Sequence, residues 1–192
     1  MSNFLLSDPD AVFIHIPKTG GSTIRVGLWE RKYTGPIFGE IPADWKRHYK
    51  FAFVRHPLER LASAYRDFRD IRRFDGGFHK FLDIVLDENI PYGRAGGNVE
   101  ISVRHHTIPQ THPYNCLEEA DFVGRYENYE KDLNKVLEAV GKEAGDFPRI
   151  RHTKGESFQD LLESSDRAWC RIIDYYQSDF DFLGYERPVQ TS

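Results

Sequence analysis

The chain has 192 residues and 40% of them are hydrophobic, which is enough apolar sequence for one sizeable core, so we expect one domain over residues 1–192. Its 26 basic and 30 acidic side chains give a formal net charge of -4. This balance does not favour nucleic acid as the main partner, because polyanion binders carry a positive excess. Two cysteines are too few for a disulfide framework, which fits a reducing compartment.

The N-terminal stretch MSNFLLSDPD does not have the pattern of a signal peptide. It contains no basic residue and meets two aspartates and a proline. No later apolar run approaches the length that crosses a bilayer. We therefore expect a cytoplasmic protein without a membrane span.

Apolar runs and helical periodicity predict strands that alternate with helices. An apolar run with one histidine in it predicts a buried strand at residues 11–16, and the stretches YKFAFV (49–54) and ADFV (120–123) predict a second and a third strand. Apolar residues at helical spacing predict helices at about residues 22–31, from Pro57 onward, at 129–140 and at 158–182. Glycine and proline interrupt residues 33–42, a predicted loop, and residues 76–112 are the least regular, with one short amphipathic piece near 78–86. The alternation indicates an α/β domain whose central parallel sheet is flanked by helices in three layers.

The first predicted strand runs into a turn that is rich in phosphate-binding groups. The stretch VFIHIPKTGGSTIR places one lysine, two glycines and three hydroxyl side chains at a helix start: Lys18, Thr19, Gly20, Gly21, Ser22 and Thr23. Backbone N–H groups at such a turn lack intrahelical partners, and glycine lets the backbone approach an anion closely. The order is not the Walker pattern, in which lysine follows the glycines. The alternative is an ordinary strand–helix turn whose glycines serve geometry only.

The second predicted strand ends in a cation. Nucleoside triphosphate enzymes of the P-loop class need a strand-end carboxylate for Mg²⁺, but YKFAFV is followed by Arg55. The planar guanidinium of Arg55 can take two oxygens of a second phosphate. Ser63, on the expected polar flank of the following helix with Arg60 and Arg66, could donate to the same group. The alternatives are a carboxylate partner for Arg55 and a solvated Ser63. Two phosphate sites suggest a nucleotide phosphorylated at both ends of its ribose.

Two stretches resemble the cofactor motifs of sulfotransferases: IPKTGGST resembles the 5′-phosphosulfate loop, and FVRHPLERLASAY resembles the 3′-phosphate motif. The chain is most similar to the carbohydrate-type branch, which includes heparan 2-O- and chondroitin/dermatan sulfotransferases. The stretches DFVGRYENYEKDLNKVLEAVG, YYQSDFDFLGYE and HHTIPQ are also similar to that branch. The resemblance implies a P-loop-like fold and the donor 3′-phosphoadenosine 5′-phosphosulfate (PAPS), with PAP as product. It implies that Arg55 and Ser63 hold the 3′-phosphate and that the 5′ end is held by Lys18, Thr19, Gly20, Gly21, Ser22 and Thr23.

The implied reaction is metal-independent in-line transfer of a sulfuryl group to a hydroxyl or amine, with Lys18 stabilising charge on the leaving phosphate. The histidine that commonly follows a glycine between the first helix and second strand of this branch has no counterpart in YTGPIFGEIPADW. The candidate general bases are therefore Glu40, His106 and His105, the last two in a loop-like region. His15 lies within a strand pattern, which favours a packed core histidine.

The acceptor and the reaction class leave alternatives. A carbohydrate or a small hydroxylated molecule is the expected acceptor, since the chain is compact for this family. An ATP-dependent phosphotransferase, which would need Mg²⁺, and a non-catalytic nucleotide-binding domain are the other possibilities. Four arginines interspersed with aspartates indicate either a solvated helix face or a patch for an anionic acceptor: Arg66, Arg69, Arg72 and Arg73.

Overall fold

The computed structural model describes residues 2–93, 95–143, 155–161 and 166–188. It divides into two compact units, each with its own core, and each is described by itself. The first comprises Met1–Arg55 and His112–Lys154, and the second comprises His56–Thr111 and Gly155–Ser192. No helix among the described residues is both long and apolar enough to cross a bilayer. The expectation of one domain over the whole chain stays a prediction.

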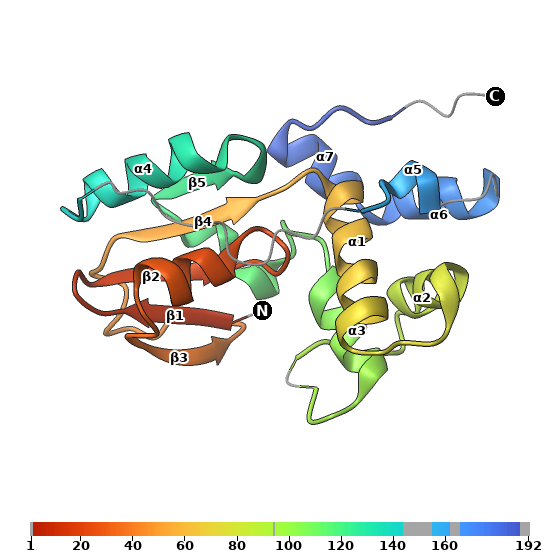
Figure 1. The fold of residues 1–192 in the computed structure, drawn as a ribbon, viewed down its shortest axis with the longest axis horizontal. Helices are drawn as coiled ribbons and strands as arrows, with labels where there is room; N and C mark the ends of the chain where they lie inside the picture. The colour runs from red at the N-terminus through yellow and green to blue at the C-terminus, as the bar shows by residue number, and fades with distance from the viewer. Residues whose placement is uncertain (1, 94, 144–154, 162–165, 189–192) are drawn as a thin grey trace. The chain divides into compact units, whose positions relative to one another are not determined.

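The first unit is built around a five-stranded mixed sheet in the order β3-β1-β2-β4-β5 (Figure 1). The three predicted strands correspond to β2, β4 and β5, which run parallel to one another. The predicted central parallel sheet is present in part, because β1 pairs antiparallel with both β2 and β3 and makes the sheet mixed. The strands are β1 (Ser2–Leu6), β2 (Ala11–His15), β3 (Tyr33–Phe38), β4 (Lys50–Val54) and β5 (Phe122–Arg125).

The strand β3 occupies residues that the sequence predicts to be a loop. Gly35 and Pro36 interrupt it, but β3 lies at the edge of the sheet, where proline is tolerated. Its register against β1 shifts between Asn3 and Leu5, and a Cβ at Gly35 would lie 2.7 Å from the backbone oxygen of Asn3. The glycine and proline therefore sit at an irregularity of an edge strand and do not end it.

The two faces of this sheet are covered by different kinds of segment. Successive strand residues point to opposite faces, so the phenylalanines of β2 and β4 share one core with η1 (Thr23–Leu28) and α4 (Tyr129–Ala139). On the other face Ile14 and Ala52 share a core with Trp45, which lies in an irregular segment. Within this unit the expected helical layer is therefore present on the first face, and turns cover the second.

The second unit is helical and has an aromatic core that includes Phe81, Trp169 and Tyr176. Residues 76–112, the least regular by prediction, contain two helices, so the prediction that His105 and His106 lie in a loop is wrong. The helix predicted at 158–182 is three helices, and residues 162–165 lie outside the described residues. The elements are α1 (Pro57–Arg66), η2 (Asp67–Ile71), α2 (Gly77–Leu86), α3 (Val99–Thr107), α5 (Phe158–Leu161), α6 (Asp166–Tyr175) and α7 (Gln177–Leu183).

Two buried arginines of the second unit bind the carboxyl ends of helices. Arg60 donates to three consecutive carbonyl oxygens at the end of α3, those of residues 106–108, at 3.0, 3.2 and 2.6 Å. Arg104 donates to the carbonyl oxygen of Val85, near the end of α2, at 2.5 Å. The last carbonyls of a helix lack intrahelical partners and carry partial negative charge, so a guanidinium satisfies both needs. The predicted polar flank of α1 is therefore wrong for Arg60, which is 0% exposed.

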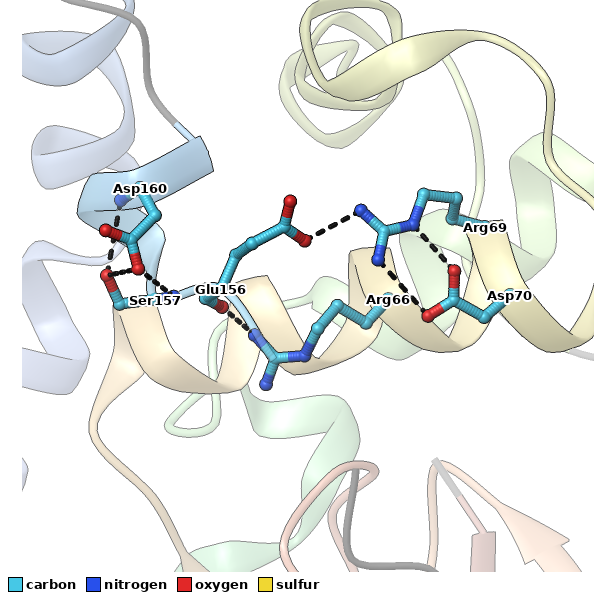
Figure 2. A network of polar contacts seen from close by, with 6 residues as sticks. All are labelled: Arg66, Arg69, Asp70, Glu156, Ser157 and Asp160. Carbon is cyan, nitrogen blue, oxygen red and sulfur yellow. Dashed lines mark hydrogen bonds and ion pairs between the residues drawn. The ribbon is translucent and has the colours of Figure 1, made fainter. Parts of the chain in front are cut away.

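The predicted solvated face of arginines is also wrong for Arg66, which is buried and contacts the backbone oxygen of Glu156. Arg69 is partly exposed and is paired with two carboxylates, through Nη1 to Glu156 at 2.8 Å and through Nε to Asp70 at 2.6 Å. These pairs balance the charge of Arg69 locally, which does not favour an anionic acceptor at this arginine. Ser157 and Asp160 form the capping contacts that begin α5. Figure 2 shows these contacts together with the arginine pairs, in a network of six residues: Arg66, Arg69, Asp70, Glu156, Ser157 and Asp160.

Candidate functional site

The turn after β2 has a backbone that few residues adopt. Lys18 has a φ of 71° and Gly20 a φ of 90°, both in the left-handed region. Such a φ costs a non-glycine residue roughly 1–3 kcal/mol, and strain of this kind concentrates at functional sites. The amide of Thr23 donates to the carbonyl oxygen of Gly20 at 3.0 Å and so turns the chain into η1. A strained lysine and successive backbone amides therefore share one turn.

The hydroxyl side chains of this turn have different surroundings. The hydroxyl of Thr19 is buried and donates to the carbonyl oxygen of Ile16 at 2.7 Å. Because its hydrogen is used there, Thr19 offers an anion its backbone amide only. Thr23 is also buried, whereas Ser22 is partly exposed and its side chain caps no described amide of η1. Ser22 is the hydroxyl of this turn best suited to donate to a ligand.

Both glycines of the turn are required by close contacts. A Cβ at Gly20 would lie 2.5 Å from the Cε2 atom of Tyr129, the first residue of α4. A Cβ at Gly21 would lie 2.4 Å from the Cδ2 atom of His15, at the end of β2. His15 is half-buried beside the ring of Phe13, so it packs beneath the turn. The turn is therefore fitted against two aromatic side chains of the same unit.

Arg55 follows β4 and reaches the turn after β2. Its Nη1 atom donates to the backbone oxygen of Lys18 at 3.4 Å. Its guanidinium carbon lies 4.4 Å from the centre of the Tyr126 ring, a cation–π contact. Tyr126 directly follows β5, so the carboxyl ends of three parallel strands supply Lys18, Arg55 and Tyr126 to one edge. Ligands of open α/β sheets bind at this edge.

Glu40 lies at the same edge of the sheet, beyond β3. Ser2 pairs with His15 of β2 on one side and with Phe38 of β3 on the other, so β2 and β3 end at the same level. At about 4.8 Å per strand, Phe38 is roughly 10 Å from His15. The side chain of Asn3 donates to the backbone oxygen of Glu40 at 2.8 Å, and the Glu40 residue is exposed. The structure thus brings Glu40 to the edge that carries the glycine-rich turn.

The other predicted site residues belong to the second unit. Ser63 lies in α1 and is 3% exposed. His105 and His106 lie in the last turn of α3. Burial, together with the positive charge of the neighbouring His106 and Arg72, lowers the pKa of His105 to about 3. The roles of Ser63, His105 and His106 in a donor or acceptor site stay predictions.

The ring of His106 uses both nitrogens in contacts within the second unit. Nδ1 lies 2.7 Å from the carbonyl oxygen of Ser102, and Nε2 lies 3.0 Å from the Nη2 atom of Arg72. A carbonyl only accepts and a guanidinium only donates, so Nδ1 carries the hydrogen and Nε2 accepts. The lone pair that would accept a substrate proton is thus engaged by an arginine.

Two tyrosines at the site, Tyr126 and Tyr129, were not singled out by the sequence analysis. The hydroxyl of Tyr129 donates to the carbonyl oxygen of Gly20 at 2.8 Å. Both lie in the stretch DFVGRYENYEKDLNKVLEAVG, which resembles the carbohydrate-type sulfotransferases. A pair of tyrosines three residues apart, directly after a predicted strand, was the signal that could have found them.

The stretches HHTIPQ and YYQSDFDFLGYE, which resemble the same branch, contact each other in the second unit. The hydroxyl of Tyr176 donates to the carbonyl oxygen of Thr107 at 2.6 Å. The buried carboxylate of Asp179 accepts from the backbone amide of Gln110 at 2.9 Å and from its side chain at 3.1 Å. These contacts tie the end of α3 to α7, so a structural role accounts for both stretches.

Comparisons with known proteins agree with these motifs. A family model described as "Sulfotransferase family" matches residues 28–186. Carbohydrate sulfotransferase 14 of Homo sapiens is 31% identical in an alignment of 183 residues that covers 79% of this chain and 46% of that protein. Carbohydrate sulfotransferase 11 of Mus musculus is 27% identical in an alignment of 235 residues, gaps included, that covers 94% of this chain and 66% of that protein. The chain thus spans about half to two thirds of the length of these relatives. No solved structure matches significantly.

Proposed function

Since the chain belongs to the sulfotransferase family, we propose that it transfers a sulfuryl group from PAPS to a hydroxyl or amine of a carbohydrate or small hydroxylated acceptor. One observation carries the proposal: Lys18 and Arg55, two cations, follow neighbouring parallel strands at the edge of the sheet where ligands bind. They are close in space, because Arg55 donates to the backbone oxygen of Lys18 at 3.4 Å. A donor with phosphate groups at both ends of its ribose requires two such cations.

The residues of the glycine-rich turn fit the 5′ end of the donor. Gly20 and Gly21 let the turn pack closely against Tyr129 and His15, and the resulting form of the backbone is proposed to bring its amides close to the anion. Lys18 supplies the charge, Ser22 a hydroxyl donor and Thr19 its backbone amide. Thr23, whose amide donates to the carbonyl oxygen of Gly20, is proposed only on its place in the motif. Arg55 fits the 3′-phosphate, because its planar group can bind two oxygens at once. Ser63 is proposed as a second donor to that phosphate.

Bound PAPS supplies the sulfuryl group and a 5′-phosphate that gains negative charge as it leaves. The ammonium of Lys18 and the backbone amides of the turn are proposed to stabilise that charge. A carboxylate or imidazole must accept the proton of the acceptor group. Glu40 is proposed for this role on its position at the same edge, with His106 and His105 as the alternatives.

The relatives are named carbohydrate sulfotransferases, which supports a carbohydrate acceptor. Membership of the family does not favour an ATP-dependent phosphotransferase. A cytoplasmic location stays a prediction from the sequence.

Calorimetric binding of PAP, ADP and ATP, each with and without Mg²⁺, tests the donor. We expect PAP to bind more tightly than ADP or ATP, with an affinity that Mg²⁺ does not change. A preference for ATP with Mg²⁺ would favour the phosphotransferase and contradict the proposal. Tight binding of PAP without turnover on carbohydrate or small hydroxylated acceptors would favour the non-catalytic nucleotide-binding domain.

A further inference from the structure

Tyr129 forms a contact with the glycine-rich turn that the proposed chemistry does not use. It is the first residue of α4, lies 109 residues from Gly20 in the chain and is 2% exposed. Its hydroxyl donates to the carbonyl oxygen of Gly20 at 2.8 Å. Its ring packs against Phe53 of β4, with ring centres 4.9 Å apart. A buried ring on a helix, packed on a strand, is a rigid support for one hydrogen bond.

This contact determines the orientation of one peptide of the turn. The carbonyl oxygen of Gly20 accepts from the Tyr129 hydroxyl and from the Thr23 amide, so both of its lone pairs are used. The peptide between Gly20 and Gly21 is trans. In a planar trans peptide the C=O and N–H bonds point in opposite directions. The amide of Gly21 is therefore turned away from Tyr129.

The ring of Tyr129 also limits the conformations open to Gly20. A Cβ at Gly20 would lie 2.5, 2.8 and 2.9 Å from the Cε2, Cζ and hydroxyl atoms of Tyr129. Gly20 already has a φ of 90°, a region in which glycine alone is at ease. Without a constraint, such a glycine samples many conformations, and its peptide can rotate. The hydroxyl of Tyr129 and the amide of Thr23 together supply that constraint, and the hydroxyl is the part that comes from outside the turn.

We propose that Tyr129 is a positioning residue of the donor site: its hydroxyl holds the Gly20–Gly21 peptide in the orientation that presents the Gly21 amide to the 5′-phosphosulfate. The identity of the ligand in this inference rests on the proposed function. The order of the turn does not, because the hydrogen bond is present without a ligand. Binding to an ordered turn avoids the entropic cost of ordering it.

The test compares Tyr129→Phe with a matched control, Tyr49→Phe. Tyr49 directly precedes β4, so the control removes a hydroxyl at the amino end of that strand, whereas the glycine-rich turn lies at the carboxyl ends of the parallel strands. PAP and adenosine 3′-phosphate are the calorimetric probes, because the second lacks the 5′ group. We expect Tyr129→Phe to weaken PAP binding about tenfold, as for one lost hydrogen bond. Binding of adenosine 3′-phosphate should not change, and Tyr49→Phe should match the wild type with both probes.

Two results would overturn the inference: unchanged PAP affinity in Tyr129→Phe, or equal losses for the two probes. Amide hydrogen exchange of the nucleotide-free proteins separates this failure from that of the proposed function. Exchange at Gly20 and Gly21 should be faster in Tyr129→Phe than in the wild type and in Tyr49→Phe. If the wild type does not bind PAP, the proposed function fails, and equal exchange in the three proteins would then refute the positioning role as well.

Discussion

Gly21→Ala tests how tightly the glycine-rich turn is fitted onto β2. Gly21 does not have a left-handed φ, so its backbone accepts alanine and the cost is steric. The new Cβ would lie 2.4 Å from Cδ2 and 2.6 Å from Nε2 of His15. Carbon atoms pack at about 3.5–4.0 Å, so the imidazole must move by about 1 Å. It is not free to do so, because Nδ1 lies 3.3 Å from the Ser2 hydroxyl and the Phe13 ring centre is 5.4 Å away.

The magnitude follows from the partner that must move. Overpacking of this kind costs about 1–3 kcal/mol, a large part of a total stability of about 5–15 kcal/mol. His15→Ala alone removes a half-buried ring and should cost about 1 kcal/mol. In the double variant the methyl group of residue 21 enters space that the ring has left. We therefore expect a coupling of about 1–2 kcal/mol that favours the double variant over the sum of the two.

Urea unfolding of the wild type, the two single variants and the double variant measures this coupling, provided the m-values agree. PAP calorimetry on the same four proteins should give weaker binding for Gly21→Ala and partial recovery in the double variant. Free energies that add within about 0.5 kcal/mol would contradict the reasoning. They would mean that the turn relaxes away from His15 and is not held by it.

Three further predictions concern Lys18, Arg55 and His105. Lys18→Ala and Lys18→Gly should each lower turnover about a hundredfold or more. Lys18→Gly should nevertheless unfold at the same urea concentration as the wild type or a higher one, because glycine relieves the strain of the positive φ. Wild-type turnover in either variant would remove Lys18 from the mechanism. Arg55→Lys should weaken PAP binding more than AMP binding in calorimetry, since lysine cannot bind a phosphate in two-pronged fashion; equal losses would count against Arg55 as the reader of the 3′-phosphate. The pKa of His105 falls from 6.5 to about 3 on folding. Between these two pH values the unfolded chain binds a proton that the folded protein does not, so the free energy of unfolding falls by about 1.4 kcal/mol for each pH unit below 6.5. His105→Gln should therefore show a shallower loss of unfolding free energy between pH 7 and 5, and identical slopes would show that His105 titrates normally.

The sequence predicts β2, β4 and β5 and misses β1 and β3. The strands β2 and β4 are apolar except for His15 and Lys50 at their ends, so hydrophobicity identifies them. The strand β3 contains Gly35 and Pro36, which favour a turn locally, and pairing with β1 overrides that preference only because β3 is an edge strand. Edge position is a property of the sheet, and no local pattern encodes it.

Some residues of the candidate site could likewise be predicted from the sequence, and others could not. Lys18 and Arg55 follow predicted strands directly, so the topology of parallel strands is enough to bring them to one edge. The contact of Tyr129 with Gly20 joins residues 109 positions apart, and no periodicity reports such a pair. Arg60 was assigned to a solvated flank on helical spacing, but its carbonyl partners lie 46–48 positions away. A local pattern shows that a side chain is polar, but it does not show whether the folded protein buries that side chain among hydrogen-bond partners.

The identity of the general base is the part of the mechanism for which the structure narrows the choice most. His105 is buried, with 8% of its surface exposed, so an acceptor hydroxyl has little access to its ring in this structure. His106 would have to give up the hydrogen bond from Arg72 to use its Nε2 atom. Glu40 is exposed and follows β3, which ends at the same level as β2, so we propose Glu40 as the first candidate.

Glu40→Gln should therefore lower kcat by about 10²–10⁴, the usual contribution of a general base, with the KM for PAPS unchanged. Asp44→Asn is the matched control, because Asp44 is an exposed carboxylate four residues further along in the same unit. Steady-state kinetics with a carbohydrate acceptor measures both variants. If Glu40→Gln retains wild-type kcat while His106→Gln loses it, Glu40 is not the base. The hydrogen bond between Arg72 and His106 would then have to break when the acceptor binds, because only a released Nε2 lone pair can take the proton.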